Sequence, residues 1–228
     1  MSTAERSISN VYIVGPQCTG KTTLVNALRD QYSSRRDIQN PVIITEIARS
    51  VIRDNGFKTE EIRSSPTRSL QLQNLIMQRQ HTVEDTASQD NGWFISDRSG
   101  LDPIVYAREH VSPEAALEMQ QSHLWETLRS RMASSLVVLC QSGTPWLYDD
   151  GVRLMPESDE AWKRLHHLFC LTLEENGIPY VTLPNCLLEL DERVAFVMSR
   201  CRLNNSSTTP DETSPGTEGK GFPGVSRS

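Results

Sequence analysis

Two hydrophobic patterns alternate along the 228-residue chain. Short runs of apolar and often β-branched residues are typical of buried strands, whereas apolar residues three or four positions apart are typical of helices that pack on one face. The short runs predict strands at 11–14, 41–45, 93–96, 135–140 and 179–183. The spaced pattern predicts helices from 22 onward and at 46–53, 67–90, 101–109, 113–132, 159–175 and 190–202, with a polar, broken stretch at 58–66.

The alternation of strands with helices predicts a three-layer α/β/α sandwich around a five-stranded, mainly parallel sheet that is covered on both faces. We expect one domain at 10–203, preceded by an N-terminal extension at 1–9. Residues 204–228 are rich in Ser, Thr, Pro and Gly, and have too few apolar residues to offset the entropy lost on ordering, so a disordered tail is predicted. Ligands of such sheets bind beyond the carboxyl ends of the strands, where the segments after the strands should converge on one crevice.

A phosphate-binding motif follows the first predicted strand. Residues 15–22 match G-x-x-x-x-G-K-[ST], and a helix is predicted directly after them. In such a P-loop the backbone N–H groups and the helix dipole hold phosphate, Lys21 would reach the β- and γ-phosphates, and the hydroxyl of Thr22 would bind Mg²⁺. An accidental glycine-rich turn is the alternative, with odds of about one per cent for a chain of this size. The residues predicted to bind ATP are Gly15, Pro16, Gln17, Cys18, Thr19, Gly20, Lys21, Thr22 and Thr23.

Composition limits the partners. The net charge of −6 predicts no basic surface for nucleic acid. No apolar run approaches the length of a membrane span, and residues 1–10 lack the apolar core of a secretory signal. The five cysteines form no C-x-x-C pair and mostly lie in apolar or helical stretches, which favours reduced core thiols in a cytoplasmic protein. No zinc spacing occurs, and His166-His167 is expected to be a helix-surface pair.

Charged residues stand directly after two of the predicted strands. Asp97 follows the third strand, where it would hold Mg²⁺ directly, hold it through water, or accept a proton; a helix cap or turn carboxylate is the alternative, since Gly100 comes soon after. Arg98 would pair with phosphate or with a carboxylate across the crevice. Glu46 follows the second strand and would orient or deprotonate an acceptor hydroxyl, with a plain helix cap as its alternative. Arg49 lies one helical turn later.

A loop punctuated by Gly, Pro and Asp is predicted at 141–158, before the helix that begins at Asp159. Residues 149–153 within it read D-D-G-V-R. An arginine in a glycine-hinged loop suits a lid that closes over a transferring phosphate. The pattern therefore predicts a catalytic role for Arg153.

Four segments, in this order and spacing, resemble the NadR-type AAA domain family. This family includes the ribosylnicotinamide-kinase domain of the bacterial NAD regulator and eukaryotic trafficking proteins that bind nucleotides and phosphoinositides. The resemblance covers residues 10–202, and its last two segments are more discriminating than the P-loop, which many families share. The segments are G-P-Q-C-T-G-K-T at 15–22, T-E-I-A-R at 45–49, S-D-R-S-G-L-D-P-I-V-Y-A at 96–107 and D-D-G-V-R at 149–153.

The resemblance implies a nucleoside-kinase-like P-loop NTPase fold that uses ATP and Mg²⁺. It implies that Lys21 and Thr22 hold ATP–Mg²⁺, that Arg153 lies in the lid, and that the charged residues after the second and third strands line the acceptor side. The predicted catalytic residues are Lys21, Glu46, Asp97 and Arg153, the predicted metal ligands are Thr22 and Asp97, and the predicted substrate-binding residues are Glu46, Arg49, Arg98 and Asp102.

Two functions agree with these residues. The first is a kinase that moves the γ-phosphoryl group of ATP to a hydroxyl of a small, nucleoside-like acceptor. The second is a nucleotide-dependent binding module, a switch or an adaptor for protein or lipid, which is compatible with peripheral lipid binding. An AAA+ motor is disfavoured because the strand at 135–140 ends in Gln-Ser rather than in an acidic pair. A regulatory GTPase is disfavoured because no N-K-x-D sequence occurs.

Overall fold

The computed structural model of the chain describes residues 9–36, 38–89, 92–145 and 158–204. Within these ranges five strands form one sheet in the order β2-β3-β1-β4-β5, and every neighbouring pair is parallel. The predicted α/β sandwich is confirmed, and its sheet is wholly rather than mainly parallel. The strands are β1 (Val11–Val14), β2 (Val42–Ile44), β3 (Phe94–Asp97), β4 (Leu136–Cys140) and β5 (Val181–Leu183). The helices are α1 (Lys21–Ser33), α2 (Ile47–Asp54), α3 (Thr59–Ser64), α4 (Pro66–Gln89), α5 (Leu101–His110), α6 (Pro113–Gln120), α7 (His123–Ala133), α8 (Asp159–Glu175) and α9 (Leu190–Asn204).

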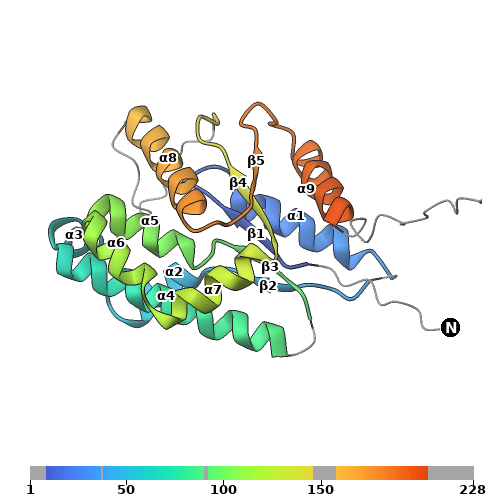
Figure 1. The fold of residues 1–228 in the computed structure, drawn as a ribbon. Coiled ribbons are helices and arrows are strands. Elements are labelled where there is room, and N and C mark those ends of the chain that lie inside the picture. The colour runs from blue at the N-terminus through green and yellow to red at the C-terminus, as the bar shows by residue number, and fades with distance from the viewer. Residues whose placement is uncertain (1–8, 37, 90–91, 146–157, 205–228) are drawn as a thin grey trace, which may run out of the picture.

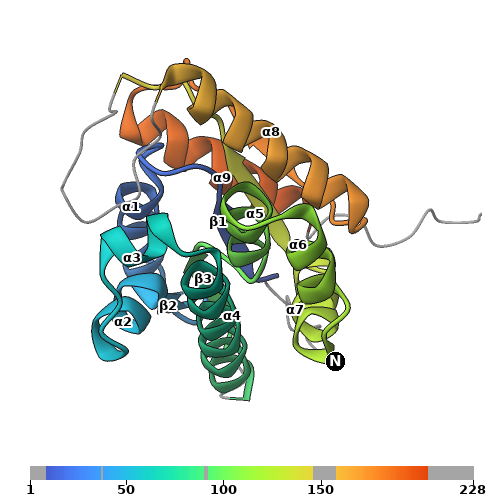
Figure 2. The same ribbon diagram turned by 90° about the vertical axis from the view of Figure 1, so that its left-hand side faces the viewer.

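Helices cover both faces of the sheet (Figure 1). Along β1, Val11 and Ile13 belong to the core shared with α1 and α9, whereas Tyr12 and Val14 belong to the core shared with α4, α5, α7 and α8. All four side chains are buried, which explains why the strand reads as a continuous apolar run rather than an alternating one. Helices α2 and α3 pack against α4 beside the sheet (Figure 2). This arrangement leaves the carboxyl ends of β1, β2 and β3 open toward one crevice.

Two helix predictions were wrong. The stretch at 58–66, expected to be broken, contains α3 and the start of α4. Ile62 of α3 is 4% exposed and supplies an apolar contact within an otherwise polar stretch. Pro66 is the first residue of α4, a position where a backbone N–H has no partner within the helix, so proline is tolerated there. The predicted helix at 113–132 is two helices, because the hydroxyl of Ser122 caps a new helix by accepting from the N–H of Trp125 at 3.2 Å.

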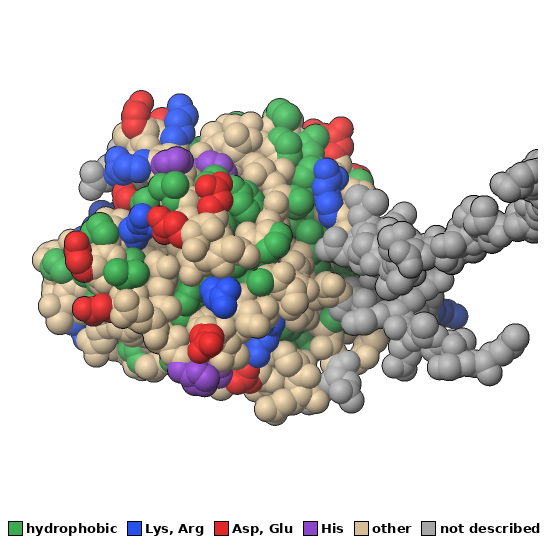
Figure 3. Space-filling model, in the orientation of Figure 1, with side chains coloured by type: hydrophobic (Ala, Val, Ile, Leu, Met, Phe, Trp, Pro, Cys, Tyr) green, Lys and Arg blue, Asp and Glu red, His purple; other side chains and the backbone are tan. Residues whose placement is uncertain are grey.

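The cysteine prediction was partly wrong. All five cysteines are free thiols, but only Cys18 and Cys140 are buried, and Cys186 is exposed. Apart from residue 9 and from Asn204, which is the last residue of α9, the predicted N-terminal extension and tail fall at 1–8 and 205–228, outside the described residues. Most of the predicted lid, at 146–157, lies outside them as well. Of the helices that the structure describes, none has the length and apolar character to cross a membrane. On the face drawn in Figure 3, basic and acidic side chains are interspersed rather than gathered by sign.

Candidate active site

The loop between β1 and α1 turns sharply because three of its residues have a left-handed backbone. The φ angles are 127° at Gly15, 57° at Cys18 and 75° at Gly20. A Cβ atom on Gly15 would lie 2.7 Å from the carbonyl oxygen of Cys140 in β4, so only glycine fits there. Cys18 holds a conformation that costs a non-glycine residue about 1–3 kcal/mol, and such strain is typical of ligand-binding loops.

Side chains from three distant segments hold the carbonyl groups of this loop. In a trans peptide unit the N–H points opposite to the C=O, so the N–H groups that follow these carbonyls face away from the side chains that hold them. Successive N–H groups directed to one side at the N-terminus of α1 form an anion site. The donors are the side chains of Trp162, Thr144 and Arg193, which lie 2.9, 3.1 and 2.7 Å from the carbonyl oxygens of Gln17, Cys18 and Thr19.

Lys21 is the first residue of α1 and is 5% exposed. Its Nζ donates to the carbonyl oxygen of Pro16 and lies 3.4 Å from Thr19 Oγ1. Burial, together with the nearby guanidinium of Arg98, lowers the pKa of Lys21 to about 8. An anionic phosphate beside Nζ would raise that pKa again, because an opposite charge favours the ammonium form.

Asp97, the last residue of β3, faces the first turn of α1. Thr22 Oγ1 donates to Asp97 Oδ2 at 2.5 Å. The other carboxylate oxygen, Oδ1, is buried and accepts no hydrogen bond from the described residues. A buried oxygen without a donor is costly, and a hydroxyl beside a carboxylate is the oxygen donor set that Mg²⁺ prefers. The pair therefore fits a magnesium ion, whereas the helix-cap alternative is not observed, since Gly100 is the N-cap residue of α5.

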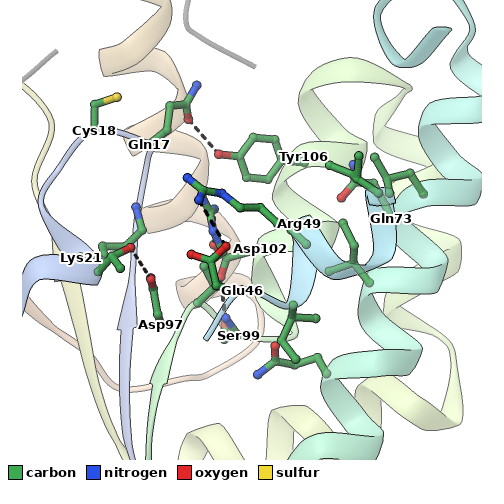
Figure 4. Close-up of a pocket in the computed structure, with 18 of the residues that line it drawn as sticks. Gln17, Cys18, Lys21, Glu46, Arg49, Gln73, Asp97, Ser99, Asp102 and Tyr106 are labelled. Carbon is green, nitrogen blue, oxygen red and sulfur yellow. Dashed lines mark hydrogen bonds and ion pairs between the residues drawn. The ribbon is translucent and has the colours of Figure 1, made fainter. Parts of the chain in front are cut away.

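Glu46 is the N-cap residue of α2, but its side chain makes no capping hydrogen bond. Its backbone is left-handed, with φ 61°, and its carboxylate pairs with Arg49 at 3.3 Å. Figure 4 shows the two side chains meeting in the crevice opposite Asp97. Glu46 is half exposed, so it lies at the rim of the crevice rather than in its floor.

Arg98 also has a left-handed backbone, with φ 85°, and its guanidinium pairs with Asp102 at 3.2 Å. The second oxygen of Asp102 accepts from the N–H and the hydroxyl of Ser99, at 2.8 and 3.0 Å. Burial raises the pKa of Asp102, an effect that Arg98 opposes. Burial alone would lower the pKa of Arg98, but Tyr106 and Asp102 raise it above its usual value, so it stays charged. Because both Asp102 oxygens are engaged within the protein, this carboxylate positions Arg98.

Tyr106 links this cluster to the P-loop. Its hydroxyl donates to Gln17 Oε1 at 2.8 Å, as Figure 4 shows, and its ring lies 5.9 Å from the Arg98 guanidinium. Burial raises the pKa of Tyr106, so the hydroxyl remains a donor at neutral pH. The side chain thereby ties α5 to the phosphate loop.

The P-loop from Gln17 onward and the charged residues that follow β2 and β3 line one pocket, which continues past them to a wall built by α2, α3 and α4. We call this surface the apolar wall. It is mostly aliphatic, and its polar side chains are uncharged. Two buried glutamines interrupt the aliphatic surface on α4. The apolar wall consists of Ile47, Ala48, Ile52, Thr59, Ile62, Leu72, Gln73, Ile76 and Gln80.

The structure brings most of the predicted site residues together. The predicted residues that line the pocket are Gln17, Cys18, Thr19, Gly20, Lys21, Thr22, Thr23, Glu46, Arg49, Asp97, Arg98 and Asp102. Gly15 and Pro16 shape the loop from outside the pocket lining, and Arg153 lies outside the described residues.

Sequence reasoning missed the apolar wall, Tyr106 and the three side chains that hold the P-loop carbonyls. Leu72 and Ile76 carried a signal, since their spacing marked an apolar helix face, but that spacing does not distinguish a face that lines a pocket from one that fills a core.

Comparisons with known proteins agree with this geometry. A family model described as an AAA domain matches residues 10–190. The chain matches none of the curated proteins in sequence. Among solved structures, NadR in complex with NR aligns with a TM-score of 0.64 and 20% identity over 92% of this chain and 55% of NadR. This chain thus spans about half the length of that protein.

Two kinases align over almost their whole length. Deoxyadenosine kinase from M. mycoides gives a TM-score of 0.63 with 11% identity over 85% of this chain and 99% of the kinase. Thymidylate kinase from Ehrlichia chaffeensis gives a TM-score of 0.58 with 15% identity over 84% of this chain and 97% of the kinase. At these identities the likeness shows the fold, which is that of the P-loop kinases.

Proposed function

The chain belongs to the NadR-type family of P-loop AAA domains, and we propose that it is a kinase that transfers the γ-phosphoryl group of ATP to a hydroxyl of a nucleoside-like acceptor. One observation carries the proposal. One pocket runs from the P-loop to the apolar wall, and Asp97, whose buried Oδ1 has no hydrogen-bond partner among the described residues, lies where the two parts meet. A pocket for ATP alone has no need of the second part.

The phosphate side suits ATP. The N–H groups of the P-loop and Lys21 would hold the β- and γ-phosphates, and the ammonium would balance charge that develops during transfer. Thr22 and Asp97 would hold Mg²⁺, which, when bound, neutralises phosphate charge and aligns the transferring group. Arg98, kept charged by Asp102, faces the same region from the end of β3.

The acceptor side suits a small molecule with a flat, weakly polar ring. The aliphatic side chains of the apolar wall would bury that ring, and the paired Glu46 and Arg49 at the rim would contact the hydroxyl-bearing sugar. Either Glu46 or Asp97 would orient the acceptor hydroxyl and take its proton. We further propose that Arg153 closes over the phosphates when both ligands are bound.

Release of ADP that depends on an acceptor tests this function. The protein would be incubated with ATP–Mg²⁺ and each of a panel of nucleosides and ribosides, and ADP would be measured with and without the acceptor. The proposal expects at least one acceptor to raise ADP release well above the rate in its absence. Asp54→Asn, which alters an exposed carboxylate of α2 outside this pocket, should keep that activity.

A binding module would give a different result. It would bind ATP–Mg²⁺ and release no ADP in excess of the acceptor-free rate with any member of the panel. That outcome, with nucleotide binding intact, would replace the kinase with the second function.

A further inference from the structure

A buried polar network lies behind the apolar wall. Its centre is Glu84 of α4, which is 0% exposed. Glu84 Oε2 accepts from the hydroxyl of Tyr12 at 2.7 Å and from the guanidinium of Arg131 at 2.9 Å. Glu84 Oε1 accepts from Nε2 of Gln80 at 2.8 Å. Three donors surround this carboxylate, and one of them is the cation paired with it, as a buried charge requires.

The network fixes which way the Gln80 amide points. A carboxylate only accepts hydrogen bonds, so the NH₂ group of Gln80 must face Glu84. The second proton of that NH₂ group goes to Ser96 Oγ, 3.1 Å away. Both donors of the amide are therefore used inside the protein. Gln80 lines the pocket, and the part of its amide left for a ligand is the carbonyl oxygen.

Gln73 provides a contrast on the same helix. It lines the pocket seven residues, or about two helical turns, before Gln80. No described residue hydrogen-bonds to its side chain. Its amide can turn either its NH₂ or its carbonyl toward a ligand. Gln80 cannot adapt in this way, so it presents a fixed acceptor where Gln73 does not.

We infer that Gln80 determines acceptor specificity: it is an oriented hydrogen-bond acceptor, held by Glu84, that selects ring systems carrying an N–H donor over ring systems that carry only acceptors. A ligand with a donor gains a hydrogen bond at Gln80. A ligand that turns a carboxylate or an ether oxygen toward Gln80 leaves two acceptors facing each other beside aliphatic side chains. This inference rests on the proposed function, since it concerns the acceptor of that reaction.

Glu84→Gln gives a directional test. In the variant, the amide oxygen at position 84 must take the place of Oε2, because Tyr12 and Arg131 both donate there. The new NH₂ group then occupies the place of Oε1 and faces Gln80. Gln80 must turn its carbonyl toward that NH₂ and present its own NH₂ to the pocket. The variant should therefore prefer acceptor groups over donor groups.

Two matched ligand pairs report the preference. Adenosine carries an amino group where 6-methoxypurine riboside carries an ether oxygen, and nicotinamide riboside carries an amide where nicotinic acid riboside carries a carboxylate. Binding would be measured by calorimetry in the presence of a non-hydrolysable ATP analogue, and kcat/KM for transfer would be measured in parallel. Wild type should bind the donor member of each matched pair about tenfold more tightly than the acceptor member. Glu84→Gln should bring this ratio of affinities, donor over acceptor, below one.

Asp85→Asn is the matched control. Asp85 is the next residue on α4 and also pairs with Arg131, at 2.6 Å, but Gln80 bonds to Glu84 rather than to Asp85. The control should keep the wild-type ratio even if its stability falls. Should Glu84→Gln fail to fold, Gln80→Met would remove the oriented acceptor and bring the ratio close to one.

The outcomes separate the inference from the proposed function. Transfer to ribosides with no donor preference in wild type, or a ratio unchanged in Glu84→Gln, would overturn the inference and leave the kinase. Equal changes in Asp85→Asn would also overturn it, because they would reveal a structural effect. Donor preference in binding without any transfer would refute the kinase and support Gln80 as the residue that selects a bound ligand rather than a phosphoryl acceptor. Absence of binding by all four ribosides would contradict both.

Discussion

The two ends of the pocket are built by different means. At the proposed phosphate end, backbone groups of one short loop would do most of the binding, and side chains from remote segments, such as Trp162 and Arg193, hold the loop in shape. At the proposed acceptor end, three helices form the surface, and because helical backbone groups are hydrogen-bonded within their own helix, side chains are left to contact a ligand. The phosphate groups are the same in every nucleotide, so a fixed loop can bind them. An acceptor ring must be distinguished from its analogues by shape and by a few oriented polar groups.

Charge divides the two ends as well. Lys21 and Arg98 line the end proposed for the phosphates, while the apolar wall is uncharged. Asp97 stands between them. If this division is functional, substitutions at one end should leave the ligand of the other end unaffected, and a substitution at the junction should impair transfer while both ligands still bind.

Asp97→Asn should have the largest effect. The amide preserves size but removes the charge that a metal ion or a proton needs, so phosphoryl transfer should fall by at least about a thousandfold. ATP affinity should change by less than about tenfold, near 1.4 kcal/mol. Rapid-quench measurement of single-turnover transfer, with ATP binding measured by calorimetry, tests both values. A transfer rate in Asp97→Asn within tenfold of the wild-type rate would show that Asp97 has no direct role in the reaction.

Lys21→Ala should have the second-largest effect on turnover. Loss of one preorganised positive group at developing charge lowers turnover by about 10²–10³. Acceptor affinity should stay within twofold, because Lys21 lies at the phosphate end. Lys163→Ala, which removes an exposed ammonium of α8, serves as the control. Equal ATP affinity and turnover in Lys21→Ala and wild type would contradict the assignment of the P-loop.

ATP affinity should depend on pH through Lys21. With a pKa of about 8 in the free protein, Lys21 is charged below that pH and loses its proton above it. Bound phosphate favours the charged form, so affinity is complete below pH 8 and falls above it, by about tenfold between pH 7 and pH 9. In Lys21→Arg the guanidinium stays charged across this range, and the fall should vanish. A fall of the same size in that variant would place the titration elsewhere.

Ile76→Val should have the smallest effect and should act only on the acceptor end of the pocket. Removing one methylene from the apolar wall costs about 0.8 kcal/mol of contact, near a fourfold loss in kcat/KM for the acceptor. The KM for ATP should not change. Steady-state kinetics with each substrate varied in turn gives both values, and a matching loss for ATP would show that the two ends are not separate.

The sequence predicted the phosphate end far better than the acceptor end, for a physical reason. The P-loop is contiguous, and its chemistry requires particular residues at fixed spacing, so residues 15–22 could be identified from the sequence alone. Asp97 and Glu46 were found because parallel strands bring their carboxyl ends to one edge. The apolar wall is drawn from residues spread over 47–80, and these residues have the periodicity of any core helix.

The errors in the predicted fold have a similar physical origin. Ser122 reads as an ordinary polar residue of a helix until the cap it forms for α7 is seen. α3 is short, with a single buried apolar residue, Ile62, which gives too little periodicity to identify it. The orientation of Gln80 depends on Glu84, Ser96 and Arg131, which come from three elements, so only their arrangement in space could reveal it.

A conjugate that spans the pocket tests the central claim most directly. Adenosine joined to a second riboside through a polyphosphate chain would occupy both ends at once if the phosphate end and the apolar wall belong to one site. Its affinity, measured by calorimetry, should then exceed that of ATP by at least about a hundredfold, because the second contact is made at high effective concentration. Lys21→Ala and Ile76→Val should each weaken it. A conjugate that binds no tighter than ATP, and whose affinity is indifferent to Ile76→Val, would contradict the account.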